Sequence, residues 1–133
     1  MADATMTVEV VSPEKVLFSG EATMVITRTL DGEVAFLPEH AAFLGALTES
    51  HTRVFLADGS VEDIAVHRGF VEVSHNKVSI LTDVAELGSQ VDVARAQSAK
   101  ERAEAALRQA HDAEAVAALS RAHARLRAAG VPA

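Results

Sequence analysis

The sequence predicts an α+β protein, with an all-β sandwich or barrel first and an antiparallel hairpin of two helices after it. Apolar residues recur with a period of two from Thr5 to about Thr82, and turn residues divide them into short segments. After Gly88 the period becomes helical and alanine dominates. With 133 residues, the chain is long enough for one hydrophobic core but not for two large domains.

The first half contains roughly eight to ten short segments with the character of strands. In two of them the inward-facing residues are expected to be Met6, Val8 and Val10, and then Ala22, Met24 and Ile26. Tight hairpin turns are predicted at Asp31-Gly32, Asp58-Gly59 and His75-Asn76. No helix-length segment separates the strands, so a parallel sheet built from βαβ units is not expected.

The second half is predicted to be helical. Residues 92–133 contain 16 alanines, and their only glycine and proline lie at the far end. Asp92 is suited to cap a helix that runs to about Ala110, and Asp112 to cap a second that runs to about Ala129 and stops at Gly130. The chain is therefore divided into a strand domain, residues 1–88, and a helical arm, residues 89–133.

The arm is expected to dock only weakly on the strand domain. Its large apolar side chains form a thin stripe, which consists of Val93, Leu107, Val116, Leu119 and Leu126. Burial of each is worth about 1.5–3 kcal/mol, and burial of an alanine much less, so docking barely exceeds the cost of ordering the arm. Residues 1–91 hold 14 acidic and 5 basic side chains, whereas residues 92–133 hold 5 and 7. We therefore expect an electropositive arm that can detach from an acidic body.

Composition narrows the classes of function. A net charge of −7 and the absence of tryptophan and tyrosine argue against nucleic acid as a partner. The absence of cysteine excludes disulfides, a thiolate zinc site and a cysteine nucleophile. No two of the six histidines have a metal-ligand spacing, and we find no nucleophile–base pattern and no phosphate-binding glycine loop. We therefore expect neither a metal site nor a catalytic site.

The sequence also indicates where in the cell the protein is expected. Its first residues lack the pattern of a secretory signal. No apolar run approaches the roughly eighteen residues of a membrane-spanning helix. A cytoplasmic or peripheral protein is therefore expected.

A set of segments occurs in a characteristic order along the chain. They are Val8-Glu9-Val10-Val11-Ser12-Pro13-Glu14, Asp31-Gly32-Glu33, Leu37-Pro38-Glu39-His40-Ala41, Gly69-Phe70-Val71-Glu72-Val73, Asn76-Lys77-Val78-Ser79-Ile80-Leu81-Thr82-Asp83 and Val91-Asp92-Val93-Ala94-Arg95-Ala96. In this ordered set the chain resembles the epsilon subunit of bacterial F-type ATP synthases over nearly its whole length.

The resemblance implies a β-sandwich of about ten strands followed by two C-terminal helices. It implies that the sandwich binds the gamma subunit and rests on the c-ring at the cytoplasmic face of the bacterial cell membrane, touching the membrane only through the complex. It further implies an arm that folds on the sandwich in one state. In another state the arm extends into the alpha/beta catalytic head and resists ATP hydrolysis. The subunit itself would catalyse nothing.

The resemblance also implies a nucleotide site. Family members bind ATP without magnesium through an Ile/Leu-Asp-x-x-Arg-Ala motif, a preceding glutamate and arginines on both helices. By position these roles fall to Glu86, Asp92, Arg95, Ala96, Arg102, Arg121 and Arg125, with Val91 in place of the Ile or Leu. A closed hairpin would gather four guanidinium groups, which bind phosphate oxygens and stay charged. No cofactor is required, and ATP is expected as a regulatory ligand.

Other interpretations of the same residues stay open. In one, Asp92 is only a helix cap and the arginines pair with neighbouring carboxylates on a solvated face. In another, implied by the resemblance, the arginines contact an acidic segment of the beta subunits when the arm extends. Four apolar residues at strand ends belong either to the core or to a partner surface: Leu17, Phe18, Phe43 and Leu44.

Three classes of function follow. The first is a central-stalk subunit that couples gamma to the c-ring and brakes ATP hydrolysis with an ATP-responsive arm. The second is a free-standing cytoplasmic ATP-sensing module. The third, an enzyme, ranks last because no catalytic constellation is present.

Overall fold

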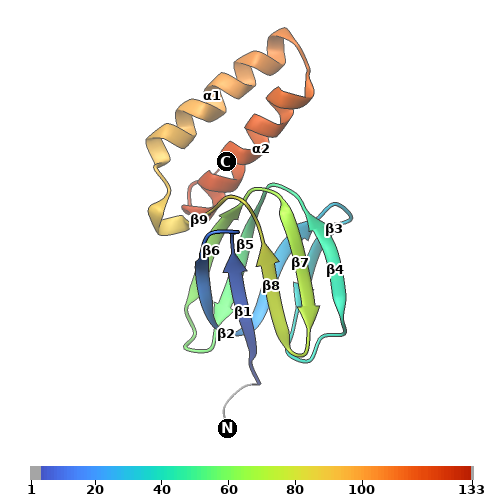
Figure 1. Ribbon diagram of the computed structural model, residues 1–133. Helices are drawn as coiled ribbons and strands as arrows, with labels where there is room; N and C mark the ends of the chain where they lie inside the picture. Colours follow the sequence, from blue (N-terminus) through green and yellow to red (C-terminus); the bar gives the residue numbers. More distant parts are fainter. Residues whose placement is uncertain (1–3, 133) are drawn as a thin grey trace.

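The computed structural model describes residues 4–132, so the two ends of the predicted domains, residues 1–3 and 133, lie outside the described residues. Within this range nine strands come first: β1 (Met6–Val11), β2 (Val16–Thr29), β3 (Gly32–Phe36), β4 (Phe43–Leu47), β5 (Ser50–Leu56), β6 (Val61–Val66), β7 (Gly69–Ser74), β8 (Lys77–Leu81) and β9 (Ala85–Leu87). A short 3-10 turn, η1 (Gly88–Gln90), leads to helices α1 (Val93–Gln109) and α2 (Ala113–Ala128). The predicted α+β architecture is confirmed (Figure 1).

The strands form one continuous sheet folded into two layers. Hydrogen-bonded neighbours follow the order β1-β8-β7-β4-β2-β5-β6-β9, with β3 beside β2 and with β1 also paired to the first half of β2. Because the 14-residue strand β2 pairs with β1, β3, β4 and β5 along its length, it ties the two layers together. The pairing of β1 with β8 is parallel and joins strands that are distant in the sequence.

The three predicted hairpin turns are present. Gly32 and Gly59 have φ values of 122° and 91°, in the region that favours glycine. His75 and Asn76 have φ values of 52° and 59° in the turn between β7 and β8. Two successive residues with positive φ match the twist of a two-residue hairpin, so this turn fixes the register of β7 against β8.

The buried face of β2 differs from the prediction beyond Ala22. Ala22 is buried, but Met24 and Ile26 are only partly buried, and the core-facing residues that follow are Val25, Thr27 and Thr29. The register of β2 with β5 shifts between Ala22 and Met24, which marks a β-bulge or similar irregularity. An extra residue reverses the alternation of faces, so the expected pattern was wrong from this point on.

The core lies between the two layers of the sandwich. Its largest fully buried side chains include Phe36, Met6, Ile64 and Ile80, and Val8 and Val10 of β1 are buried as predicted. Leu17, Phe18 and Phe43 pack partly buried against this core, whereas Leu44 is 71% exposed. Of the four strand-end residues left open above, three therefore contribute to the core.

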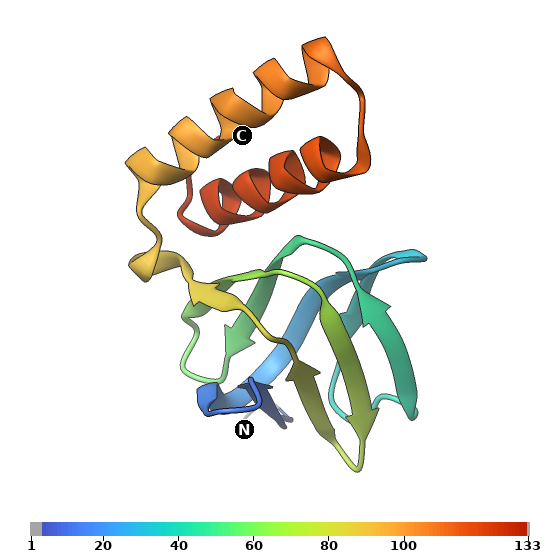
Figure 2. The same cartoon turned by 45° about the horizontal axis from the view of Figure 1, so that its top comes forward.

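The two helices form an antiparallel hairpin at one end of the sandwich (Figures 1 and 2). Helix α2 packs against β5 and β6, and α1 lies on the far side of α2. The Asp92 side chain accepts a hydrogen bond from the Arg95 backbone N–H at 3.0 Å, and Asp112 accepts one from Ala115 at 2.8 Å. Both predicted helix caps are confirmed. No helix among residues 4–132 is long and apolar enough to cross a membrane.

Alanines, rather than the predicted stripe of larger residues, are most of the arm's buried residues. Leu126 of that stripe is fully buried, but Val116 is 41% exposed. The buried residues of α1 are Ala96 and Ala103, and α2 meets the sandwich through a cluster of three buried alanines. This cluster, which we call the alanine seam, consists of Ala65, Ala124 and Ala128. Small side chains allow close backbone approach, and each buried carbon contributes only about 0.8 kcal/mol.

Candidate functional site

A cavity of about 690 Å³ opens between α1, α2 and the segment that joins them to the sandwich. All seven residues expected at a ligand site line it: Glu86, Asp92, Arg95, Ala96, Arg102, Arg121 and Arg125. Its volume lies within the roughly 300–1,000 Å³ that small-molecule sites occupy. The fold therefore brings these residues around one space.

Helical spacing explains why the four arginines converge. Arg95 and Arg102 are seven residues apart on α1, and Arg121 and Arg125 are four apart on α2, so each pair shares a helix face. The antiparallel hairpin turns these two faces toward each other across the cavity. The buried Ala96 and Ala103 of α1 leave room between the helices.

The lining is electrically balanced. Four carboxylates, those of Glu86, Asp92, Asp112 and Glu114, stand beside the four guanidinium groups. Sequence reasoning did not assign Gln90, Asp112 or Glu114 to the site. Glu114 could have been found from its spacing, because it lies seven residues before Arg121 on the same helix face.

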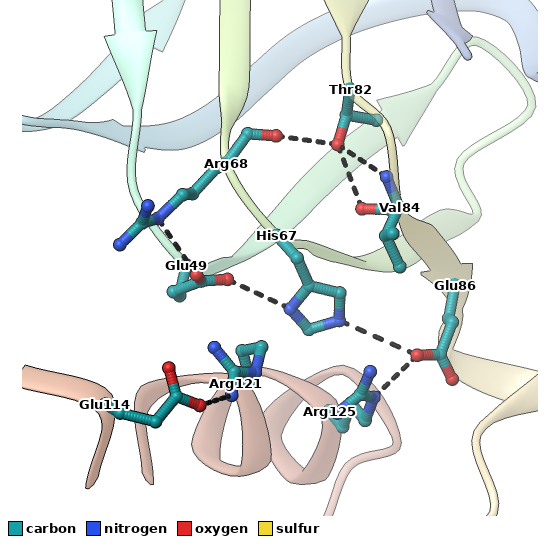
Figure 3. Close-up of polar contacts among 9 residues, drawn as sticks. All are labelled: Glu49, His67, Arg68, Thr82, Val84, Glu86, Glu114, Arg121 and Arg125. Carbon is teal, nitrogen blue, oxygen red and sulfur yellow. Dashed lines mark hydrogen bonds and ion pairs between the residues drawn. The ribbon is translucent and has the colours of Figure 1, made fainter. Parts of the chain in front are cut away.

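Two of the arginines have carboxylate partners. Arg121 Nη2 lies 2.9 Å from Glu114 Oε1, and Arg125 Nε lies 2.6 Å from Glu86 Oε1 (Figure 3). Arg95 and Arg102 make no ion pair with any residue in the described range 4–132. Two guanidinium groups are therefore free to receive an anion, and the other two keep N–H donors beyond the one that each gives to a carboxylate.

A polar cluster adjoins the cavity where α2 meets the sandwich (Figure 3). His67 Nδ1 lies 3.1 Å from Glu49 Oε2, and His67 Nε2 lies 3.6 Å from Glu86 Oε1. Arg68 Nε lies 3.4 Å from the other Glu49 oxygen. Burial lowers the pKa of His67, and the Arg125 charge lowers it further, while Glu49 and Glu86 act in the opposite direction. We call His67, Glu49, Arg68, Glu86 and Arg125 the His67 cluster.

Histidine and carboxylate side chains do not form a metal centre in the described part of the chain. No group of three or more His, Cys, Asp or Glu residues within 4–132 could hold a metal ion. The carboxylates beside the cavity are instead occupied with arginines and helix caps.

Comparison with known proteins gives the family. Residues 5–88 match the family described as "ATP synthase, Delta/Epsilon chain, beta-sandwich domain", and residues 89–130 match its "long alpha-helix domain". An "ATP synthase epsilon chain" of Desulfitobacterium hafniense is 45% identical over 128 residues, covering 94% of this chain and 96% of the relative. One of Streptomyces griseus is 38% identical over 128 residues, covering 96% and 98%. The chain belongs to the ATP synthase epsilon chain family. ATP synthesis and ion transport are the processes in which this family takes part.

Solved structures share the fold of this chain. A chain in the cryo-EM structure of the Euglena gracilis mitochondrial ATP synthase, OSCP/F1/c-ring, matches with a TM-score of 0.81 at 21% identity, covering 97% of this chain and 83% of that one. A chain of the Tetrahymena thermophila mitochondrial ATP synthase, central stalk/c-ring, matches with a TM-score of 0.56 at 15% identity, covering 69% and 73%. At these identities the likeness establishes the fold alone.

Proposed function

We propose that this chain is a non-catalytic rotor subunit that joins the gamma subunit to the c-ring, and that its arm is an ATP-responsive brake on ATP hydrolysis by the alpha/beta head. The observation that carries the proposal is the contrast between a well-packed sandwich and a lightly held arm. In the described residues 4–132, the alanine seam is the cluster of buried apolar residues between the arm and the sandwich, and one ion pair, Arg125 with Glu86, joins them. In this proposal the chain lies at the cytoplasmic face of the bacterial membrane, bound only through the complex.

The sandwich offers surface for binding other subunits. Leu30, Leu44 and Phe70 are 73%, 71% and 55% exposed. Leu30 and Phe70 line one groove together with Val116 of α2. Exposed apolar side chains that gather in a groove favour a protein contact. The solved structures with this fold come from assemblies that contain a c-ring or central stalk, which supports a place beside the rotor.

The weak attachment of the arm supports its proposed role as an inhibitor of ATP hydrolysis. A few buried alanine carbons at about 0.8 kcal/mol each, plus one partly exposed ion pair, leave little to resist release. Release would separate Arg125 from Glu86 and add its charge to that of the already exposed Arg95 and Arg102. Such a cationic surface would bind an acidic segment of the beta subunits, with a strength that falls as salt rises.

The cavity fits ATP without magnesium as the ligand that favours the folded arm. Its volume is adequate, and four guanidinium groups are placed to hold a triphosphate through charge-assisted hydrogen bonds. Glu86 and Asp92 accept hydrogen bonds from the adenine amino group or the ribose hydroxyls. Because ATP would bridge both helices, it would stabilise the closed hairpin in proportion to its concentration.

Deletion of the arm tests this function in the assembled enzyme. We expect a chain truncated before Asp92 to retain gamma and to raise ATP hydrolysis by the membrane complex. The control is the full-length chain assembled to the same level. If the complex with the truncated chain hydrolyses ATP no faster than the complex with the full-length chain, the arm does not inhibit hydrolysis.

The ATP cavity also suits a free-standing ATP-sensing module, which is the second candidate. Affinity purification of the full chain from membranes separates the two candidates. Recovery of gamma, alpha and beta subunits supports the rotor subunit. Tight ATP binding by a chain that recovers none of them supports the sensor instead.

A further inference from the structure

His67 lies at the boundary between the sandwich and the arm. It directly follows β6, its side chain is only 4% exposed, and its ring stands between Glu49 and Glu86 on the side that faces α2 (Figure 3). Nδ1 is within hydrogen-bond reach of Glu49 Oε2 at 3.1 Å. Nε2 is buried and has no hydrogen-bond partner among the described residues. In a neutral ring that donates from Nδ1, Nε2 is an unsatisfied acceptor that faces a carboxylate oxygen.

The carboxylate oxygen that faces Nε2 is also the arm's attachment point. Glu86 Oε1 lies 3.6 Å from His67 Nε2 and 2.6 Å from Arg125 Nε. A proton on Nε2 would turn this acceptor into a donor aimed at the same oxygen. It would also place a second positive charge beside the Arg125 guanidinium.

We propose that His67, Glu86 and Arg125 form a proton-sensitive latch, in which protonation of His67 draws Glu86 away from Arg125 and releases helix α2 from the sandwich. The inference rests on the proposed mobility of the arm and adds the signal that controls it. ATP favours the docked arm and acidification favours the released one.

The direction of the effect follows from which groups move. Glu49, Arg68 and Glu86 belong to the sandwich in both states, whereas Arg125 belongs to α2, which lies beside the buried ring (Figure 3). Burial and Arg125 are the two influences that lower the pKa of His67 below 6.5. Release removes both, so the pKa of His67 is higher in the released state. The docked state therefore has its full stability, relative to the released state, at pH values above the His67 pKa of the released state. That stability is lost as the pH falls through the lower His67 pKa of the docked state.

Two other histidines near the arm serve as matched controls. His51 on β5 is paired with Asp63 at 2.6 Å, within the sandwich. His123 on α2 has its pKa lowered by burial and by the charges of Arg127 and Lys100, with Glu104 opposing them. Neither is bonded to a residue that joins the arm to the sandwich. Substitution of either histidine therefore leaves the latch residues in place.

The test measures arm docking in the isolated full-length chain. Because the chain has no cysteine, spin labels can be placed on Ser19→Cys in β2 and Ala105→Cys in α1, both exposed positions. Distance distributions are recorded from pH ~7.5 to ~5.5. We expect the ratio of docked to released arm to fall by at least about threefold over this range. His67→Gln should abolish the change, and His51→Gln and His123→Gln should retain it.

A second measurement covers the case in which His67→Gln does not fold. In Arg125→Gln, the His67 ring loses its positive neighbour, so its pKa measured by NMR should rise relative to wild type. An unchanged His67 pKa in Arg125→Gln would overturn the latch. So would a pH response that persists in His67→Gln, or a wild-type arm that stays docked at every pH. The deletion experiment above is independent of His67, so failure of the latch and failure of the brake are distinguishable.

Discussion

Arg95 and Arg102 differ from the other two arginines of the cavity in having no carboxylate partner in the described chain. An anion that enters the cavity therefore meets two guanidinium groups that are already available. Arg121 and Arg125 each already give one N–H donor to a carboxylate, that of Glu114 or Glu86, which offsets part of their positive charge. Each helix contributes two arginines to the cavity, but α1 is expected to contribute more of the free energy of anion binding than α2.

We expect Arg95→Ala to weaken ATP binding by roughly 1.5–3 kcal/mol, the worth of a charge-assisted hydrogen bond. Isothermal titration calorimetry of the isolated chain measures the change. Arg108→Ala is the matched control, since Arg108 lies near the end of the same helix, is exposed and does not line the cavity. Titrations of Arg95→Ala that match those of wild type would exclude Arg95 from the site.

The resemblance to the family indicated the cavity residues, and local rules account for part of their pattern. Asp92 caps a helix and the arginines recur at helical spacing, so their common face is readable before the fold is known. The His67 cluster could not be read this way. It joins Glu49, His67 and Glu86 from different parts of the sandwich with Arg125 from α2, and such a meeting depends on tertiary structure.

At the scale of elements, local patterns succeeded where strands and helices were regular. Hairpin turns and caps were predictable because each depends on two or three adjacent residues. The buried face of β2 was predicted wrongly after Ala22, where the register is irregular. One extra residue there moves every later side chain to the opposite face of the sheet. The parallel pairing of β1 with β8 could not be predicted either, because strands that are far apart in the sequence leave no local pattern that shows they are neighbours.

Gly88 begins the turn η1, between the sandwich and α1. A Cβ at this position would overlap the backbone carbonyl oxygen of Ala128, at the end of α2. Because neither backbone segment can give way cheaply, one of them must move. The element most weakly held is the arm, so a side chain at residue 88 is expected to displace the end of α2.

We therefore expect Gly88→Ala to lower the ratio of docked to released arm by at least about tenfold, equivalent to ~1.4 kcal/mol. Spin labels at residues 19 and 105 report the change. Ser89→Ala, an exposed position in the same turn, is the control and should leave docking unchanged. A docked population in Gly88→Ala equal to that of wild type would contradict this role of Gly88.

For the whole molecule, two kinds of packing coexist in 133 residues. The sandwich buries large side chains such as Phe36 and Ile80, each worth about 1.5–3 kcal/mol. Among the described residues, the arm meets the sandwich through a cluster of alanines and one ion pair. In the proposed function, this difference lets the arm move as a unit while the sandwich stays folded.

A covalent lock across the alanine seam tests whether movement of the arm is the brake. Ala65 of β6 and Ala124 of α2 pack in one cluster, and the chain has no cysteine to interfere. In Ala65→Cys/Ala124→Cys, oxidation should hold the arm on the sandwich and raise ATP hydrolysis by the assembled complex to the level reached when the arm is deleted. Reduction should restore the slower rate, and each single cysteine variant should not respond to oxidation. A cross-linked complex that hydrolyses ATP as slowly as the reduced one would show that the brake, if present, does not require the arm to leave the sandwich.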